Sequence, residues 1–396
     1  MIKGENIVCI ANTSWFGNYA KSTVQILERL AKENKILFVE YPYTIKDVVS
    51  TLQGKQKAPV KSMLGLEKSL YQIETNSGTK IWNLVTPPGL PLYFLKNESV
   101  FNFLFKYNTF IYKNKLKRAL KKLGMEKPLV ITAFNPFYGL SMLGKLKEKS
   151  HVYYCYDGVE ASFFGKRIFD FEDKFSRKVP AIITTSDFLN EQKLKLNKDS
   201  FVVKNGVDFP VFAKSAKTDI HKRERKKIGF IGSFDHRFDL ETVEYAVSQM
   251  PEYDFEFVGD MRNEVSRTAL SKYPNVSFGN PVTPNEVPPL MADCDAGIIP
   301  YLMNEVNRNI YPLKINEYMS VGVPVVMNNF ATLPEFDGMV SVANNKAEFV
   351  EKLKTEIEQD NKEKIMKRIE FASENSWEAR TESFSKILEK ILASNP

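Results

Sequence analysis

The feature that most constrains this chain is a repeated alternation between short apolar runs and segments with the spacing of amphipathic helices. Residues 7–10 are apolar, residues 22–32 carry apolar side chains at helical spacing, and residues 36–39 are apolar again. This order is typical of a parallel sheet, because parallel strands are joined by crossover helices. It predicts further strands at residues 129–133, 152–156, 181–185 and 201–203, whereas residues near 44–125 look irregular, aromatic and basic.

The alternation stops and then restarts, which predicts two domains. Residues 214–227 are polar and charge-rich, as in a linker. Beyond them we expect a helix from Asp239 to about Met250 and strands at residues 228–231, 255–258, 276–278, 296–299 and 325–327. The predicted fold class is therefore α/β with two doubly wound domains, at residues 1–210 and 228–375, and a linker at 211–227.

Charge and cysteine content narrow the partners and the compartment. The net charge of +7 favours an anionic partner, which leaves nucleic acid, anionic lipid and nucleotide-sugar open. The separated cysteines, Cys9, Cys155 and Cys294, resemble buried reduced thiols and fit the cytosol. The start lacks the apolar region of a signal peptide, and no window of about 20 residues is free of charge. We therefore expect a cytoplasmic protein.

The segment 309–326 predicts an anion site. Pro312 suits the first turn of a helix, and Gly322 suits its left-handed end. Lys314 and Glu317 are three residues apart, so they share one helix face near the positive amino end. Such an end with a lysine binds phosphate, and a carboxylate one turn further accepts hydrogen bonds from sugar hydroxyls. Diphosphate and ribose together point to a nucleotide-sugar.

A second candidate lies after the first strand of the second domain. The sequence Gly229-Phe-Ile-Gly232 is not the GxGxxG fingerprint, which argues against a nicotinamide enzyme. A tight turn at Gly232 and Ser233 leads instead to His236 and Arg237. Its N–H groups and the arginine could contact phosphate, although a plain strand–helix turn with a solvated arginine explains the segment equally well.

Two carboxylate positions have competing interpretations. Asp157 follows a predicted strand at the sheet edge where ligands bind, so it could serve as a base or acceptor anchor, or simply as an Asp-Gly turn residue. Asp293 and Asp295 match the DxD pattern of metal-dependent sugar transferases. Because they lead directly into an apolar run, we interpret them as helix-end and strand-entry residues and predict no metal site.

Residues 90–127 contain many basic side chains, mostly lysines, together with many aromatic side chains. That composition suits an anionic membrane surface or single-stranded nucleic acid. Core helices with a solvated basic face explain it as well.

Several short motifs follow one another in a specific order along the chain: Lys204–Asp208, Ile228–Gly232, Phe257–Asp260, Asn275–Gly279, Ala292–Pro300, Pro312–Tyr318 and Gly322–Val326. Together they resemble a GT-B glycosyltransferase, specifically the retaining bacterial family that uses nucleotide-sugars to build cell-surface polysaccharides. The resemblance covers almost the whole chain.

The resemblance implies two Rossmann-like domains facing across a cleft, with the donor on the second and the acceptor on the first. Glu317 would bind the donor ribose, and Arg237 and Lys314 would stabilise the leaving diphosphate. The helix at 376–396, from about Trp377, would cross back to the first domain. The remaining expected donor contacts are Gly232, Ser233, His236, Asn309, Tyr311, Pro312 and Leu313, and the expected acceptor-side residues are Trp15, Phe16 and Gly17. Asn309 departs from the family, which often has Glu there.

These expectations describe an enzyme that moves a sugar from a nucleoside-diphosphate sugar to a hydroxyl of a glycan or lipid-linked acceptor. The resemblance implies retention at the anomeric carbon, and we expect no metal, no cofactor and no nucleic-acid partner. The basic, aromatic first domain suggests a peripheral position on the inner face of the cell membrane. A nucleotide-sugar 2-epimerase-like enzyme and a non-catalytic nucleotide-sugar or lipid-binding member of the fold are the alternatives.

Overall fold

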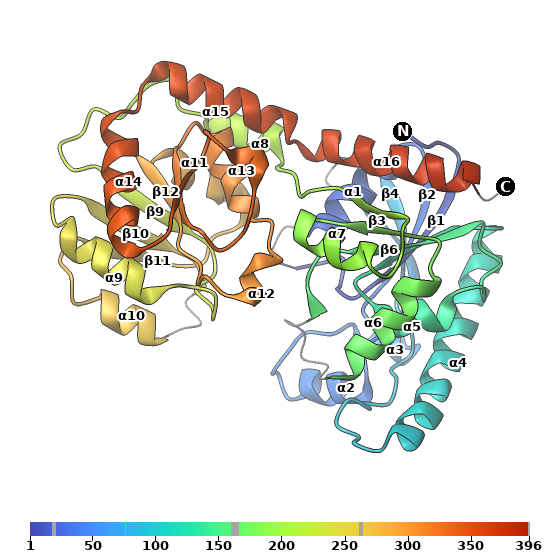
Figure 1. Cartoon of the computed structure of the whole chain (residues 1–396). Helices are drawn as coiled ribbons and strands as arrows, with labels where there is room; N and C mark the ends of the chain where they lie inside the picture. The colour runs from blue at the N-terminus through green and yellow to red at the C-terminus, as the bar shows by residue number, and fades with distance from the viewer. Residues whose placement is uncertain (18–20, 76, 160–165, 261–263, 395–396) are drawn as a thin grey trace. The chain divides into compact units, whose positions relative to one another are not determined.

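The computed structural model describes residues 1–17, 21–75, 77–159, 166–260 and 264–394, in two compact units (Figure 1). Unit 1 comprises Met1–Val203 and Thr381–Pro396, and unit 2 comprises Lys204–Arg380. The segment 211–227, which we predicted as a linker, lies inside unit 2. Several of its charges are paired: for example, the Lys217 ammonium lies 3.4 Å from the Asp360 carboxylate, with both side chains buried. A charge-rich composition alone does not reveal such pairing.

Unit 1 is built on an eight-stranded sheet in the order β3-β4-β2-β1-β5-β6-β7-β8. Neighbouring strands are parallel except β3 and β4, which are antiparallel. The strands are β1 (Asn6–Ala11), β2 (Lys35–Val39), β3 (Leu70–Glu74), β4 (Lys80–Leu84), β5 (Leu129–Ala133), β6 (Ser150–Cys155), β7 (Ala181–Thr184) and β8 (Ser200–Val202).

The helices of unit 1 include a long one that the sequence did not disclose. They are α1 (Ser22–Leu30), α2 (Ile45–Leu52), α3 (Val60–Met63), α4 (Glu98–Leu123), α5 (Pro136–Met142), α6 (Arg167–Lys178) and α7 (Asp187–Leu194). Our expectation that residues near 44–125 are irregular was wrong, since β3, β4 and α4 lie there. In α4, aromatic side chains are buried on one face, as at Phe101 and Phe105, and exposed on another, as at Phe103. That distribution hides the single apolar stripe by which a helix is recognised.

Unit 2 is built on a parallel six-stranded sheet in the order β11-β10-β9-β12-β13-β14. Its strands are β9 (Lys227–Ile231), β10 (Asp254–Val258), β11 (Val276–Gly279), β12 (Ala296–Ile299), β13 (Val325–Asn328) and β14 (Ser341–Ala343). Its helices are α8 (Phe209–Phe212), α9 (Leu240–Gln249), α10 (Glu264–Leu270), α11 (Val287–Ala292), α12 (Glu305–Arg308), α13 (Leu313–Ser320), α14 (Lys346–Glu358) and α15 (Lys362–Glu374). The five strands predicted for this part are present; β14, only three residues long, was missed.

The last helix, α16 (Trp377–Ser394), contains the boundary between the units. From Thr381 onward it belongs to unit 1. There the Phe384 ring lies 5.4 Å from the Tyr154 ring, and the backbone N–H of Ile2 donates to the Ser385 hydroxyl.

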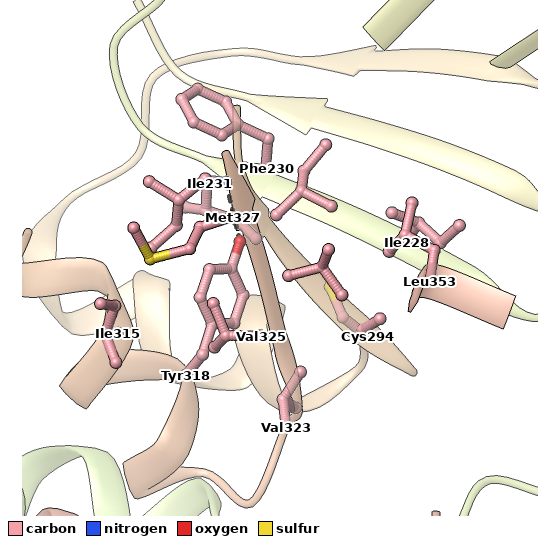
Figure 2. Packing of buried hydrophobic residues seen from close by; sticks show 14 of the residues in the cluster. Ile228, Phe230, Ile231, Cys294, Ile315, Tyr318, Val323, Val325, Met327 and Leu353 are labelled. Atoms are coloured by element: carbon pink, nitrogen blue, oxygen red, sulfur yellow. Dashed lines mark hydrogen bonds between the residues drawn. The ribbon is translucent and has the colours of Figure 1, made fainter. Parts of the chain in front are cut away.

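At the centre of the unit 2 sheet, the buried hydroxyl of Tyr318 hydrogen-bonds to strand β9 where the pairing of β9 with β12 ends. The strands β9 and β12 are paired only at Ala296 with Ile228 and at Gly297 with Gly229. Beyond that point the Tyr318 hydroxyl donates to the carbonyl O of Gly229 at 2.8 Å and accepts from the N–H of Ile231 at 3.1 Å. Figure 2 shows Tyr318 reaching from α13 to Ile231. A Cβ at Gly297 would lie 2.6 Å from the Tyr318 ring, so only glycine admits it.

Replacing Tyr318 by Phe is expected to destabilise unit 2 by about 2 to 4 kcal/mol, because two buried backbone groups lose their partner. The free energy of unfolding from urea titration measures it. Tyr107→Phe, at an exposed position, is the control and should change the stability little. Equal stability of the two variants would contradict this account of the sheet.

In the described part of the chain, no helix has both the length and the apolar character that crossing a bilayer requires. Cys9, Cys155 and Cys294 are buried free thiols, as the sequence predicted.

Candidate functional site

The order of strands in unit 2 marks where a ligand would bind. From β9 the chain first extends the sheet through β10 and β11, and later on the other side through β12, β13 and β14. In open α/β sheets, ligands bind beyond the carboxyl ends of the strands at such a switch point. Here that point is the end of β9, where the strands β9 and β12 separate.

Two glycines bring the loops after β9 and β10 into contact at this point. The N–H of Gly232 donates to the carbonyl O of Val258 at 2.8 Å. A Cβ at Gly259 would lie 1.9 Å from the carbonyl O of Gly232. Gly259 therefore requires the absence of a side chain, because the atom it would meet is backbone, and the loop after β10 holds the loop at Gly232 in place.

Lys314 lies directly against this glycine. A Cβ at Gly232 would lie 2.4 Å from Lys314 Cε and 2.5 Å from Nζ. The ammonium also lies 5.8 Å from the centre of the Phe230 ring, within cation–π range. The structure thus brings together Gly232 and Lys314, two residues that the sequence had placed in separate candidates.

Helix α13 carries Lys314 in its first turn. We predicted that the helix begins at Pro312; it begins at Leu313, with Pro312 as the extended N-cap residue. Proline has no side-chain acceptor, and no side-chain cap is formed at this end. The N–H groups of the first turn and the Lys314 ammonium therefore present positive charge together, which suits a diphosphate.

Glu317 lies one turn further along α13 and is half-buried. Burial raises the pKa of its carboxyl above the ordinary value, while the nearby Lys314 opposes this. A half-buried carboxylate is a good acceptor for two adjacent hydroxyls of a ribose, because binding them compensates for the lost hydration.

Replacing Glu317 by Gln is expected to stabilise the ligand-free protein more at higher pH. Because the folded pKa is raised, the stability that the protonated carboxyl contributes is present below the unfolded pKa and is lost as pH rises through the folded pKa. The variant resembles the protonated form, so it should match the parent protein at about pH 4, below the unfolded pKa, and exceed it at about pH 8. Melting temperatures across this range measure the effect. An unchanged difference in melting temperature over the range would refute it, and the exposed Glu363→Gln is the control.

Arg237 is held by its own loop. Its Nε lies 2.9 Å from the Asp235 carboxylate, and its guanidinium lies 5.3 Å from the Tyr301 ring centre. The arginine contributes to lowering the pKa of Asp235. His236 is exposed, and Ser233 is half-buried beside Gly232. The ion pair between Arg237 and Asp235 therefore stabilises the turn, so Arg237 is not simply a solvated side chain.

The segment before α13 is packed inward. Asn309 is buried, and its amide donates to the carbonyl O of Val306 at 3.4 Å. Tyr311 is buried too; its hydroxyl accepts from the Asn316 amide at 3.3 Å, and burial raises its pKa to about 12. Leu313 is half-buried at the helix start. Through its hydrogen bond with Asn316, Tyr311 holds the segment before α13 against the helix.

The predicted acceptor-side residues lie at the switch point of unit 1, between β1 and β5. Trp15, Phe16 and Gly17 follow β1, and Phe16 is exposed. The Lys21 ammonium binds the carbonyl O atoms of Ser14 and Phe16, at 2.5 and 2.6 Å. Lys21 therefore holds the backbone of this loop at Ser14 and Phe16.

Glu40, which sequence reasoning missed, also supports this loop. It is buried at the end of β2, and its carboxylate accepts from the N–H of Trp15 at 3.2 Å. Burial raises its pKa, with Ser14, Trp15, Asn83 and Lys21 acting in the opposite direction. A charged residue directly after an apolar strand was the available signal, and it is the same signal that had singled out Asp157.

The other carboxylates have local partners. Asp157 follows β6, is half-buried, and accepts from the N–H of Gly158 at 2.9 Å. Asp293 ends α11 and lies 2.6 Å from the Lys227 ammonium. Asp295 accepts from the N–H of Lys227 and pairs with Arg223 at 3.1 Å. The helix-end and strand-entry interpretation of Asp293 and Asp295 is thereby confirmed.

Comparison with known proteins gives a family for unit 2. Residues 225–359 match the family model described as "Glycosyl transferases group 1". A relative is TuaH of Bacillus subtilis (strain 168), named as a teichuronic acid biosynthesis glycosyltransferase. It is 32% identical over 179 residues, which are 43% of this chain and 45% of TuaH. The chain thus spans less than half the length of that relative.

Solved structures match over the whole chain. Sucrose-phosphate synthase from Thermosynechococcus elongatus superimposes with a TM-score of 0.70 at 14% identity, covering 99% of this chain and 100% of that one. A structure described as trehalose-6-phosphate from E. coli bound with UDP-2-fluoro glucose gives 0.68 at 10% identity, covering 98% and 99%. These likenesses establish the fold that the sequence predicted. Residues 225–359 are therefore similar to the group 1 glycosyl transferases, and the chain that contains them has the GT-B fold.

Proposed function

We propose that the chain transfers a glycosyl group from a nucleoside-diphosphate sugar to a hydroxyl of a glycan or lipid-linked acceptor. One observation carries the proposal: Lys314, at the positive end of α13, lies against Gly232 at the switch point, with Glu317 one turn away on the same helix. The match of residues 225–359 to a glycosyl transferase family supports it.

In this reaction the bond between the anomeric carbon and the diphosphate oxygen breaks, and a bond from the acceptor oxygen to that carbon forms. The nucleoside diphosphate leaves with the bonding electrons, and the acceptor hydroxyl gives up its proton. We assign stabilisation of the departing charge to Lys314 and the N–H groups of α13. The remaining donor contacts are assigned to Glu317 for ribose and to Gly232, Ser233, His236, Asn309, Tyr311, Pro312 and Leu313.

Arg237 reaches a diphosphate only if its ion pair with Asp235 opens or is shared, so we give it the smaller electrostatic role. Asp157 is our candidate for the acceptor proton or for anchoring the acceptor, and Trp15, Phe16 and Gly17 for acceptor contacts. Retention at the anomeric carbon and a metal-free reaction follow from the family resemblance and remain part of the proposal.

The acceptor class is proposed from the relative. TuaH is named for teichuronic acid biosynthesis, so envelope polysaccharide precursors are the first acceptors to test, at the cytoplasmic side of the membrane. UDP-sugars are the first donors, because a neighbouring structure is described with a UDP-sugar analogue.

The test incubates the protein with nucleoside-diphosphate sugars, with and without acceptor, and identifies the products by mass spectrometry. Glycosylated acceptor with one nucleoside diphosphate released per transfer supports the proposal. A nucleotide-sugar epimerised at C2 without acceptor would favour an epimerase. Donor-dependent thermal stabilisation without any turnover would favour a non-catalytic binding protein.

A further inference from the structure

Unit 1 exposes an apolar surface on two helices, which we call the aromatic face. On α4 it consists of Phe103, Tyr107 and Phe110, whose exposed fractions are 74%, 54% and 58%. Their spacing of four and three residues puts them on one stripe. They line a shallow apolar hollow together with Leu90, Leu104 and Lys106. Exposed aromatic side chains that lie together in this way indicate a surface that binds a partner outside the chain.

Helix α2 extends the aromatic face with a second stripe. Ile45, Val49 and Leu52 have the same spacing and are exposed, and no residue of α2 is buried. The stripe belongs to a short helix whose Thr44 and Asp47 form a capping box. A helix whose apolar side chains are at best half-buried, as Val48 is here, gains little from packing within its own chain.

The two helices are held at the same end of unit 1. The N–H of Ile45 donates to the carbonyl O of Gly89 at 2.9 Å, and the N–H of Leu90 donates to the Asn108 side chain of α4 at 2.8 Å. Figure 1 shows α2 and the amino-terminal part of α4 at this end of the unit. The two stripes thus belong to helices that are held at the same end of unit 1.

Positive charge follows this apolar surface along α4. Helix α4 contains seven basic residues, Lys106, Lys113, Lys115, Lys117, Arg118, Lys121 and Lys122, and a single acidic one, Glu98. Glu98 is paired with Arg167 at 2.6 Å. Along the aromatic stripe, the positions after Phe110 on the same helix face are Asn114, Lys117 and Lys121. The partner of this surface must therefore accept both apolar insertion and a dense positive field.

An anionic lipid bilayer meets both requirements. Aromatic and aliphatic side chains enter the boundary between head groups and acyl chains, while lysines remain at the phosphates. A nucleic acid would stack on the aromatic rings but would offer no apolar environment to Ile45, Val49 and Leu52. We propose that the aromatic face docks unit 1 on the surface of a membrane that contains anionic lipid. The surface is remote in sequence from Lys314 and Glu317, so the proposal stands or falls independently of glycosyl transfer.

The experiment is co-sedimentation of the full chain with vesicles of phosphatidylcholine alone or of phosphatidylcholine with phosphatidylglycerol. Three multiple variants are compared with the parent protein. One carries Phe103→Ser, Tyr107→Ser and Phe110→Ser, and one carries Lys106→Glu, Lys117→Glu and Lys121→Glu. The matched control carries Met366→Ser, Lys362→Glu and Lys367→Glu on α15 of unit 2, where Met366 is likewise exposed. All the replaced side chains are exposed, so folding should be retained, which circular dichroism checks.

We expect the parent protein to bind the anionic vesicles and to be released by salt. Each face variant should lower the partition coefficient about tenfold or more, and the control variant should bind as the parent protein does. A separate Phe103→Trp variant should be quenched by brominated lipid.

Three results would overturn the proposal. They are a parent protein that stays in the supernatant with both vesicles, equal losses in the control and the face variants, and a parent protein that is a dimer in solution and becomes a monomer with the aromatic variant. The last result would show that a second copy covers the face.

Discussion

Replacing Lys314 by Met is expected to slow glycosyl transfer about 100- to 1000-fold while leaving unit 2 folded. The methionine side chain keeps most of the apolar stem beside Gly232 and removes only the charge. The lysine is partly exposed, so little stability depends on it. Negative charge develops on the leaving diphosphate in the transition state, and the positive charge of Lys314 stabilises it most strongly there. The turnover number with saturating donor measures the loss.

Two further variants make this result decisive. Lys367→Met removes an exposed lysine from α15, outside the candidate site, and should leave turnover unchanged. Lys314→Ala should lose as much as Lys314→Met, because the charge rather than the stem is at issue. Turnover near that of the parent protein in Lys314→Met would remove Lys314 from the catalytic assignment.

The sequence was sufficient for five of the six strands of unit 2 and for α13, because each of them depends on local information. The strands β9, β10 and β12 are short apolar runs bounded by polar residues, and α13 is bounded by Pro312 and Gly322. The shared helix face of Lys314 and Glu317 follows from their spacing alone. Local patterns of this kind are enough to predict a phosphate site and a ribose site on one helix.

Contacts between elements were beyond the reach of such patterns. The approach of Gly259 to Gly232 and the two hydrogen bonds of the Tyr318 hydroxyl depend on how three elements are packed, to within a few tenths of an ångström. A sequence pattern fixes which residues share a face but not the distance to another element. The ion pair of Arg237 with Asp235 is a different omission: the two residues are close in sequence, but only the turn geometry brings them together.

Unit 1 was predicted less well for a physical reason. Its helices α2 and α4 expose apolar side chains that a rule based on burial assigns to a core. The same side chains that obscured the secondary structure form the surface that we propose for the membrane. An error of this kind is informative, since a residue that violates the pattern of burial often serves a contact outside the chain.

Replacing Gly232 by Ala is expected to reduce transfer about 100-fold by moving the Lys314 ammonium. The new methyl group would lie 2.4 Å from Lys314 Cε, and the end of a lysine side chain yields more readily than the backbone does. The fold should therefore survive, with the charge displaced from the switch point. Gly338→Ala, where a Cβ meets nothing within 4 Å and φ is also positive, controls for backbone strain.

A double-mutant cycle tests whether the glycine acts through the lysine. If Gly232 matters because it leaves room for Lys314, then Gly232→Ala combined with Lys314→Ala should be no slower than Lys314→Ala alone, and the two effects will be strongly non-additive. If instead the two losses multiply, the methyl group acts on the donor or on the loop itself. The contact between Gly232 and Lys314 would then be a matter of packing alone, and the glycine would contribute to transfer independently of the lysine.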